Sequence, residues 1–166
     1  LWDFLYKPSR YIFTLAGGIR LQEHDIYIID FVPKNKGLYE GRLYISLSSY
    51  TLLRADFHYA DGKHGRNFKL MGLSFKEEEY KISVFFEKTD ERYHLKYFSF
   101  KKVSSFGIDR KLTLLKKRKK PLFDKTLLEL KGAIDMQVRT QQSFECLLLS
   151  YEDISPSDYH HFEQSK

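Results

Sequence analysis

The chain has little of the residues that cross-link or break a fold, with one cysteine and four prolines among 166 residues. A single cysteine excludes an intrachain disulfide. Cys146 lies in the apolar run Phe144–Leu149, and we interpret it as a small core side chain, because no His or Asp partner for a nucleophile can be identified. No apolar run approaches the roughly 20 residues of a membrane helix.

Motifs of catalysis and metal binding are also missing. Gly17-Gly18 is not followed by a phosphate-binding helix, no nucleophile elbow is present, and Glu77–Glu79 fit a solvated charge run. The nearest approach to a metal cluster is His58 and His64 around Asp61, which we interpret as polar turn chemistry. We therefore predict a non-enzyme with no metal and no cofactor. A catalytic site assembled across strands is the alternative.

Aromatic residues are abundant, at 16% of the chain, and they recur with the period of a β-strand. Apolar and polar side chains alternate over 43–47, 52–59, 80–86 and 93–97. Such alternation places one face of a strand on a core and the other toward water or a second layer. The runs 26–29 and 147–149 are apolar at every position, which predicts cover on both faces or an inner face that receives an apolar ligand.

Polar turn signals separate these runs. They are Pro33–Gly37, Ser48-Ser49, Asp61–Gly65 and Thr89–Glu91. We predict a mainly β fold in which about ten strands form one strongly curved antiparallel sheet, an open half-barrel with little helix, over residues 1–154. Residues 155–166 show no period and are expected to form a C-terminal tail.

Helix signals are weak. Ser74–Glu79 offers one helical turn at most. Phe123–Met136 mixes apolar and charged residues, but Gly132 interrupts it, and we favour a strand there over a helix.

Positive charge exceeds negative charge by six, and much of the excess is local. The basic run consists of Lys116, Lys117, Arg118, Lys119 and Lys120. A run of this kind is typical of a solvated strand end, and it also fits a patch for nucleic acid, anionic lipid or acidic glycan. Cations interleaved with aromatics over 93–102 fit either a single-strand-binding sheet or a strand with one buried face. Nucleic-acid binding is the less favoured interpretation.

Three consecutive segments, Tyr11–Gly17, Asp25–Lys34 and Leu38–Ser46, carry a family resemblance. They resemble the β-rich region of large Bacteroidetes envelope proteins that begin with a carboxypeptidase-like regulatory domain. The hairpin series is also similar to the outer-membrane lipoprotein-sorting (LolA-like) fold, whose curved sheet has an apolar concave face. Arg54 matches the basic residue of the following strand. Ser46 departs from the pattern, which usually has Asp there, and the change is expected to affect only turn chemistry.

The resemblance implies an exported protein in the periplasm or at the outer membrane, with the regulatory domain upstream of Leu1 and any signal peptide removed with it. It implies no catalytic residues. Together, the alternating aromatic strands and the missing catalytic set predict a non-catalytic binding module. Its partner would be a hydrophobic ligand such as a lipid, or an envelope protein, with peripheral membrane contact. Polyanion binding through 116–120 and an envelope enzyme are the alternatives.

From the residues themselves, Gly41 is expected to let its strand bend or bulge, Pro33 to end a strand, and Arg54 to face an acidic partner, Glu40 or Asp56.

Overall fold

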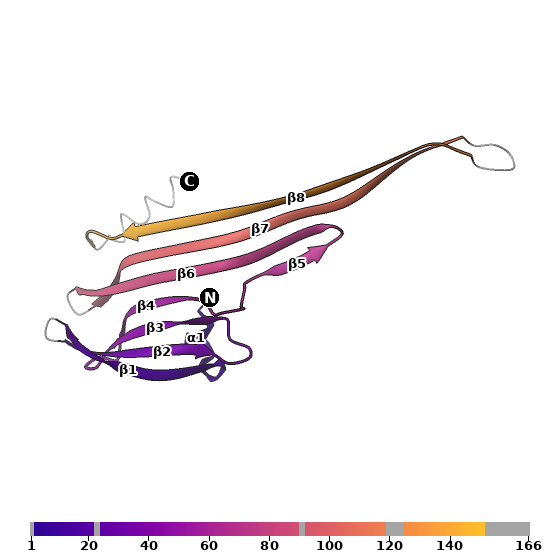
Figure 1. Ribbon diagram of the computed structural model, residues 1–166. Helices are drawn as coiled ribbons and strands as arrows, with labels where there is room; N and C mark the ends of the chain where they lie inside the picture. The colour runs from indigo at the N-terminus through magenta and orange to yellow at the C-terminus, as the bar shows by residue number, and fades with distance from the viewer. Residues whose placement is uncertain (1, 22–23, 90–91, 119–124, 152–166) are drawn as a thin grey trace, which may run out of the picture.

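The computed structural model describes residues 2–21, 24–89, 92–118 and 125–151. Eight strands form one antiparallel sheet in the order β1-β2-β3-β4-β6-β7-β8, and β5 pairs with β6 (Figure 1). The strands are β1 (Tyr11–Leu21), β2 (His24–Pro33), β3 (Tyr39–Ser46), β4 (Leu52–Tyr59), β5 (Asn67–Leu70), β6 (Leu73–Thr89), β7 (Arg92–Arg118) and β8 (Lys125–Leu147). Two short helical turns, α1 (Asp3–Tyr6) and η1 (Pro8–Arg10), precede them.

The mainly β, antiparallel fold is confirmed, but the described residues form eight strands and not about ten. The strands are fewer because they are longer: Ser74–Glu79, expected to offer a helical turn, lies inside β6. Polar residues do not end a strand when one of its faces is solvated. The sheet is neither closed nor strongly curled, so the expected strong curvature is not found (Figure 1).

The segment favoured as a strand over 123–136 is confirmed from Lys125 onward, where β8 begins. Gly132 does not interrupt β8, which pairs with β7 through that position. Pro33 ends β2, as expected. Residues 155–166, the expected tail, lie outside the described part of the chain.

One face of the sheet, the core face, holds the buried side chains of β2, β3, β4 and β6. Across neighbouring strands Leu43 is opposite Ala55, and Ala55 is opposite Val84. Ala55 and Val84 are almost fully buried, as is Phe57 two residues along β4. The period-two alternation seen in the sequence therefore marks the core face correctly in these strands.

Phe4 of α1 covers the core face of the first four strands. Its ring lies 4.4 Å from that of Phe31 on β2 and 5.0 Å from that of Phe57 on β4, measured between centroids. Trp2 adds an edge-to-face contact with Phe57 at 5.2 Å. Figure 1 shows α1 lying on this half of the sheet. The N-terminal segment thus covers the core face of β1–β4 with the protein's own aromatic side chains.

Tyr11 joins this N-terminal segment to the β2–β3 connection. Its hydroxyl donates a hydrogen bond to the Asp3 carboxylate and accepts one from the Leu38 backbone N–H at 3.1 Å. Burial, reinforced by the Asp3 carboxylate, raises the pKa of Tyr11. The buried hydroxyl therefore stays protonated and can satisfy both partners at once.

Gly41 is needed for close approach and not for a bulge. A Cβ at this position would lie 2.2 Å from the Asp56 carbonyl oxygen and 2.6 Å from the Phe57 Cβ. The β3–β4 register is regular at Gly41 and shifts only between Tyr44 and Ile45. The expected bulge is therefore displaced toward the end of β3, and Gly41 makes room for the strand beside it.

A row of rings in contact, some stacked and some tilted, crosses five strands on the core face and is called the aromatic row here. It consists of Tyr39 on β3, Tyr59 on β4, Tyr80 on β6, Phe100 on β7 and Phe144 on β8. Successive ring centroids lie 5.4, 5.8, 6.5 and 5.9 Å apart. Aromatic pairs at such spacings stabilise a fold by about 0.5–1.5 kcal/mol beyond the area that they bury.

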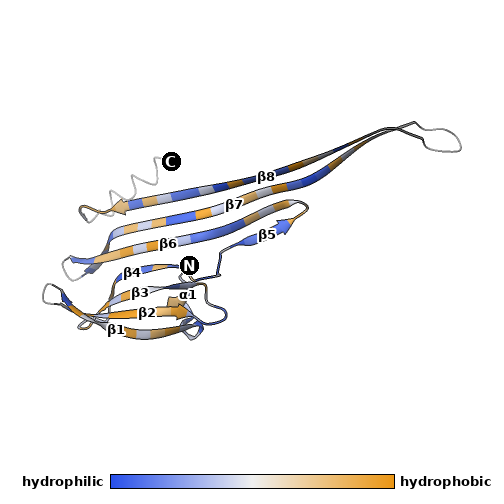
Figure 2. Ribbon diagram, viewed as in Figure 1, coloured by the Kyte–Doolittle hydropathy of each residue, from blue (hydrophilic) through white to orange (hydrophobic). Residues whose placement is uncertain are grey.

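The second half of the sheet, β5 to β8, carries apolar side chains that α1 does not cover. Figure 2 shows hydrophobic and hydrophilic positions alternating along β7 and β8 where they extend beyond the other strands. The larger exposed apolar side chains of this region are Phe68, Leu70, Phe106, Leu112, Leu114, Leu130, Ile134, Met136 and Val138. None of the helices in the described residues has the length and hydrophobicity that a membrane crossing requires.

Removing the Phe4 ring should destabilise the protein strongly. We expect Phe4→Ala to lower the free energy of unfolding by about 3–5 kcal/mol, because a fully buried aromatic ring leaves a cavity that its neighbours fill only in part. Urea unfolding followed by circular dichroism measures the change. Leu5→Ala is the matched control, since Leu5 lies on the same turn with about half of its surface exposed. An equal loss in the two variants would contradict the role given to Phe4.

Alkaline pH should unfold the protein through the tyrosines of the aromatic row. Burial raises the pKa of Tyr80, raises that of Tyr59 to about 12, and raises that of Tyr39 further. Because these values exceed the unfolded value of about 10, the stability they contribute is complete below pH 10. It is lost as the pH rises through about 12.

Tyrosinate absorbance and circular dichroism, recorded together, test this expectation. The buried tyrosines of the aromatic row should ionise only as the native circular dichroism is lost. Titration of every tyrosine in one step near pH 10 in the native state would contradict it.

Candidate ligand-binding cavity at the split between two strands

The junction between β4 and β6 is short. The two strands pair over five residue pairs, from Arg54↔Phe85 to His58↔Lys81. Beyond Arg54 the chains diverge, and β6 continues against β7 alone after a register shift between Phe85 and Phe86. The sheet is therefore split at this end, and side chains instead of a strand line the opening.

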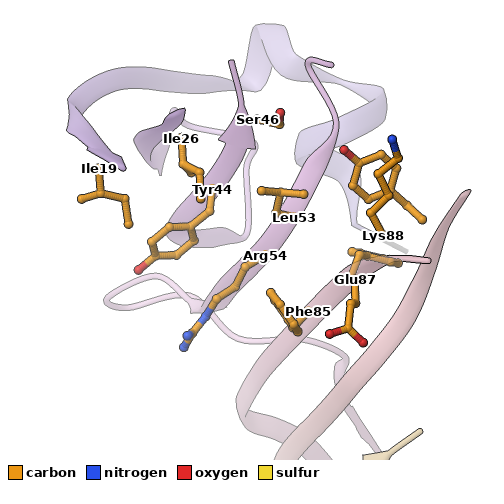
Figure 3. Close-up of a pocket in the computed structure, with 11 residues that line it drawn as sticks. Ile19, Ile26, Tyr44, Ser46, Leu53, Arg54, Phe85, Glu87 and Lys88 are labelled. Carbon is orange, nitrogen blue, oxygen red and sulfur yellow. The ribbon is translucent and has the colours of Figure 1, made fainter. Parts of the chain in front are cut away.

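A cavity of about 350 Å³ occupies the split, a volume within the range of small-ligand sites. Most of its wall is apolar or aromatic: Ile19, Ile26, Tyr44, Leu53, Phe85, Phe86 and Tyr93. The polar lining residues are Ser46, Arg54, Glu87 and Lys88. Figure 3 shows Tyr44, Arg54 and Phe85 lying side by side along this wall.

Arg54 is a charged residue of the cavity that is held by two hydrogen bonds to one carboxylate. Its Nε donates to Asp56 Oδ2 at 2.7 Å and its Nη2 donates to Asp56 Oδ1 at 3.2 Å. The guanidinium also lies 5.5 Å from the centroid of the Tyr44 ring, within cation–π distance. The hydrogen bond to Asp56 raises the pKa of Arg54, so the cation persists at every physiological pH.

Asp56 is itself held by a neighbour on β6. The Ser83 hydroxyl donates a hydrogen bond to Asp56 Oδ1, and Ser83 is directly opposite Asp56 in the β4–β6 pairing. This chain of contacts fixes the direction in which Arg54 points. Of the two acidic partners expected for Arg54, the structure has Asp56, while Glu40 lies near His58.

The turn between β3 and β4 contacts the start of β7 beside the split. Ser49 Oγ and the Tyr93 hydroxyl lie 3.0 Å apart and join this turn to the start of β7. Ser46 is 2% exposed, and its hydroxyl accepts a hydrogen bond from the Ser49 backbone N–H at 3.3 Å. Ser46 therefore takes part in the turn and also lines the cavity, and the expectation that its departure from the family pattern affects only turn chemistry stays a prediction.

The cavity does not lie where the sequence indicated an apolar recess. Along β3 and β4, Tyr44 and Arg54 alternate with Leu43 and Ala55, so they point away from the core face. The core face of β1–β4 is filled by Phe4. The apolar run 26–29 agrees with this arrangement only in part, because Ile26 is buried but Tyr27 is exposed.

Of the basic run Lys116–Lys120, the structure describes only the backbone of 116–118, at the end of β7, and Lys119 and Lys120 lie outside the described residues. The polyanion patch therefore stays a prediction.

The cations interleaved with aromatics on β7 are largely paired. Lys96 lies 2.9 Å from Glu87, Lys101 lies 3.8 Å from Glu79, and Lys102 pairs with Glu77. The acidic partners all belong to β6. The run Glu77–Glu79, interpreted from the sequence as a solvated charge run, lies in β6. Its glutamates balance the positive charge of β7. This pairing weakens the case for a nucleic-acid surface on that strand.

His58 and His64, the histidines around Asp61, each bond the backbone carbonyl of the next residue in the chain. His58 Nδ1 donates to the Tyr59 carbonyl at 2.8 Å, and His64 Nδ1 donates to the Gly65 carbonyl at 3.1 Å. Within the described part of the chain no three His, Cys, Asp or Glu side chains gather as a metal site.

Cys146 is half-buried on β8, and its neighbours Leu147 and Leu149 are exposed. The cover predicted for both faces of the run 147–149 is therefore not provided by the described residues.

Sequence patterns did not indicate the cavity because its residues come from six strands. Ile19, Leu53 and Tyr93 are far apart in the chain, and only the early end of the β4–β6 pairing brings them together. The one residue in the sequence that pointed toward this site was Arg54, a basic residue on a strand that also carries Phe57 and Tyr59.

No family model, curated protein or solved structure matches the chain. The resemblance to envelope proteins therefore stays a prediction.

Proposed function

We propose that this protein is a non-catalytic binding module that holds an amphipathic, anionic ligand in the split between β4 and β6. The observation that carries the proposal is the pairing of an apolar wall with a fixed cation, Arg54, in a cavity of about 350 Å³. Apolar pockets with a few placed polar groups are the usual form of small-ligand sites.

The two parts of the cavity favour one kind of ligand. Ile19, Leu53 and Phe85 offer surface that an acyl chain or ring would cover. Asp56 occupies Nε and Nη2 of Arg54, and a guanidinium has five N–H donors, so donors remain for a carboxylate or phosphate. A lipid fragment or fatty acid combines both features.

The cell envelope is the setting that we propose, on the resemblance of 11–46 to envelope proteins. The half-barrel with a ligand on its concave face remains part of that family expectation. The cavity supports a different location for the ligand, on the face opposite Phe4. The exposed apolar positions of β7 and β8 would add contact with an envelope partner.

Calorimetric titration with decanoate and with 1-decanol tests this function, because the two probes share a chain and differ in charge. We expect both to bind, and we expect Arg54→Gln to weaken decanoate by roughly 10- to 150-fold while leaving 1-decanol unchanged. That range corresponds to about 1.5–3 kcal/mol for a hydrogen bond to a charged group. Leu53→Trp, which fills the cavity, should weaken both probes.

Arg42→Gln is the matched control. Arg42 is an arginine on β3 that also bonds an aspartate, with its Nε 2.6 Å from Asp30 Oδ1, and it does not line the cavity. Absence of binding by both probes would overturn the proposal. An equal effect of the two arginine variants would show that Arg54 has no special role.

A further inference from the structure

The outer edge of β8 is long and regular. β8 pairs with β7 on one side, and the described residues place no strand on the other. Its register against β7 runs without a shift from Tyr97↔Leu147 to Lys116↔Leu128. By contrast, β1 at the opposite edge is interrupted by a shift between Leu15 and Gly17. An unbroken edge presents a row of backbone donors and acceptors that another strand can bond.

Two of the usual devices that protect an edge, proline and charge on the core face, are missing from this part of β8. The strand contains no proline. On the core face, positions 132 to 142 carry no charge. Ile134, Met136 and Val138 are each exposed by 40 to 50% of their surface on that face. Pairing with another strand would give each of these side chains a cross-strand neighbour.

We propose that the edge of β8 binds a second copy of this chain, strand against strand and antiparallel, with Gln137 on the two-fold axis. In that register residue 135 of one copy is opposite residue 139 of the other. In such a pairing the numbers of any two opposite residues add up to the same value as for residues 135 and 139. The inference goes beyond the ligand-binding function and does not depend on it.

Charge complementarity supports this register. Asp135 of one copy is opposite Arg139 of the other, and the two-fold axis makes this contact twice. Within one chain Asp135 is opposite Asp109 on β7, so two carboxylates are neighbours. Arg139 of the second copy offsets that repulsion, because opposite charges directly across a strand pair stabilise it. Within one chain Arg139 bonds Glu78 and Glu79 of β6 through Nε and Nη2, so its side chain must turn toward the open edge to meet Asp135 of the second copy.

The apolar positions agree with the same register. Met136 is opposite Val138 of the other copy, and Ile134 is opposite Thr140. β-branched side chains such as Val138, Ile134 and Thr140 fit the pleated surface and pack against the cross-strand neighbour on the same face. Pairing extends from Lys131 to Ser143 and stops there, because Glu145 would next be opposite position 129, which also holds a glutamate.

A cysteine on the proposed axis tests the register in the full chain. In a Cys146→Ser background, Gln137→Cys should form an intermolecular disulfide under mild oxidation, because opposite Cα atoms in an antiparallel pair lie about 4.5–5.5 Å apart. Gln141→Cys is the matched control. The two copies of residue 141 would be displaced by eight residues, roughly 26 Å, and should not cross-link.

Analytical ultracentrifugation of the unmodified chain and of Asp135→Arg completes the test. We expect a concentration-dependent dimer, weakened at least tenfold by Asp135→Arg, which would put two like charges opposite each other at both contacts. A protein that stays monomeric at high concentration overturns the proposal. So does a dimer in which Gln137→Cys fails to cross-link, or in which Gln141→Cys cross-links equally well.

Discussion

The five-residue pairing of β4 with β6 is the connection on which the arrangement of the sheet depends. On one side of it lie β1 to β4 with their own aromatic cover, and on the other lie the longer strands β6 to β8. A ladder this short supplies few backbone hydrogen bonds. The aromatic row adds to these few hydrogen bonds. The rings of Tyr59 on β4 and Tyr80 on β6 lie 5.8 Å apart across the junction and join the two halves of the sheet.

The short pairing also explains why the cavity exists. Where two neighbouring strands diverge, the backbone no longer fills the sheet, and side chains from both must line the opening. Leu53 and Phe86 face the gap from its two sides. Arg54 belongs to the last pair before the strands separate. Asp56 and Ser83, which are opposite each other two pairs further in, hold it there. The charge at the rim is thus anchored in the regular part of the sheet.

How much of this could be predicted from sequence depends on the range of each interaction. Alternation over 52–59 identified Ala55 and Phe57 as core, because burial of a strand face is a local property of period two. The continuity of β6 through Ser74–Glu79 was missed, since its glutamates are balanced by lysines of β7 that no local pattern reveals. The cover that Phe4 gives to the core face of β1–β4, and the cavity at the β4–β6 split, both depend on contacts between distant segments. The amino-acid composition carries no information about such contacts.

The same division of the sheet accounts for its open edge. α1 and η1 can cover only the strands near the N-terminus, so the apolar positions of β7 and β8 receive no cover from them. Their side chains alternate as strictly as those of β4, which is the pattern of a face prepared for contact. A hairpin that was only a solvated extension would gain nothing from Ile134, Met136 and Val138 at successive positions on one face. Pairing of β8 with a second copy extends to this half of the molecule the cross-strand packing that the N-terminal half completes within one chain.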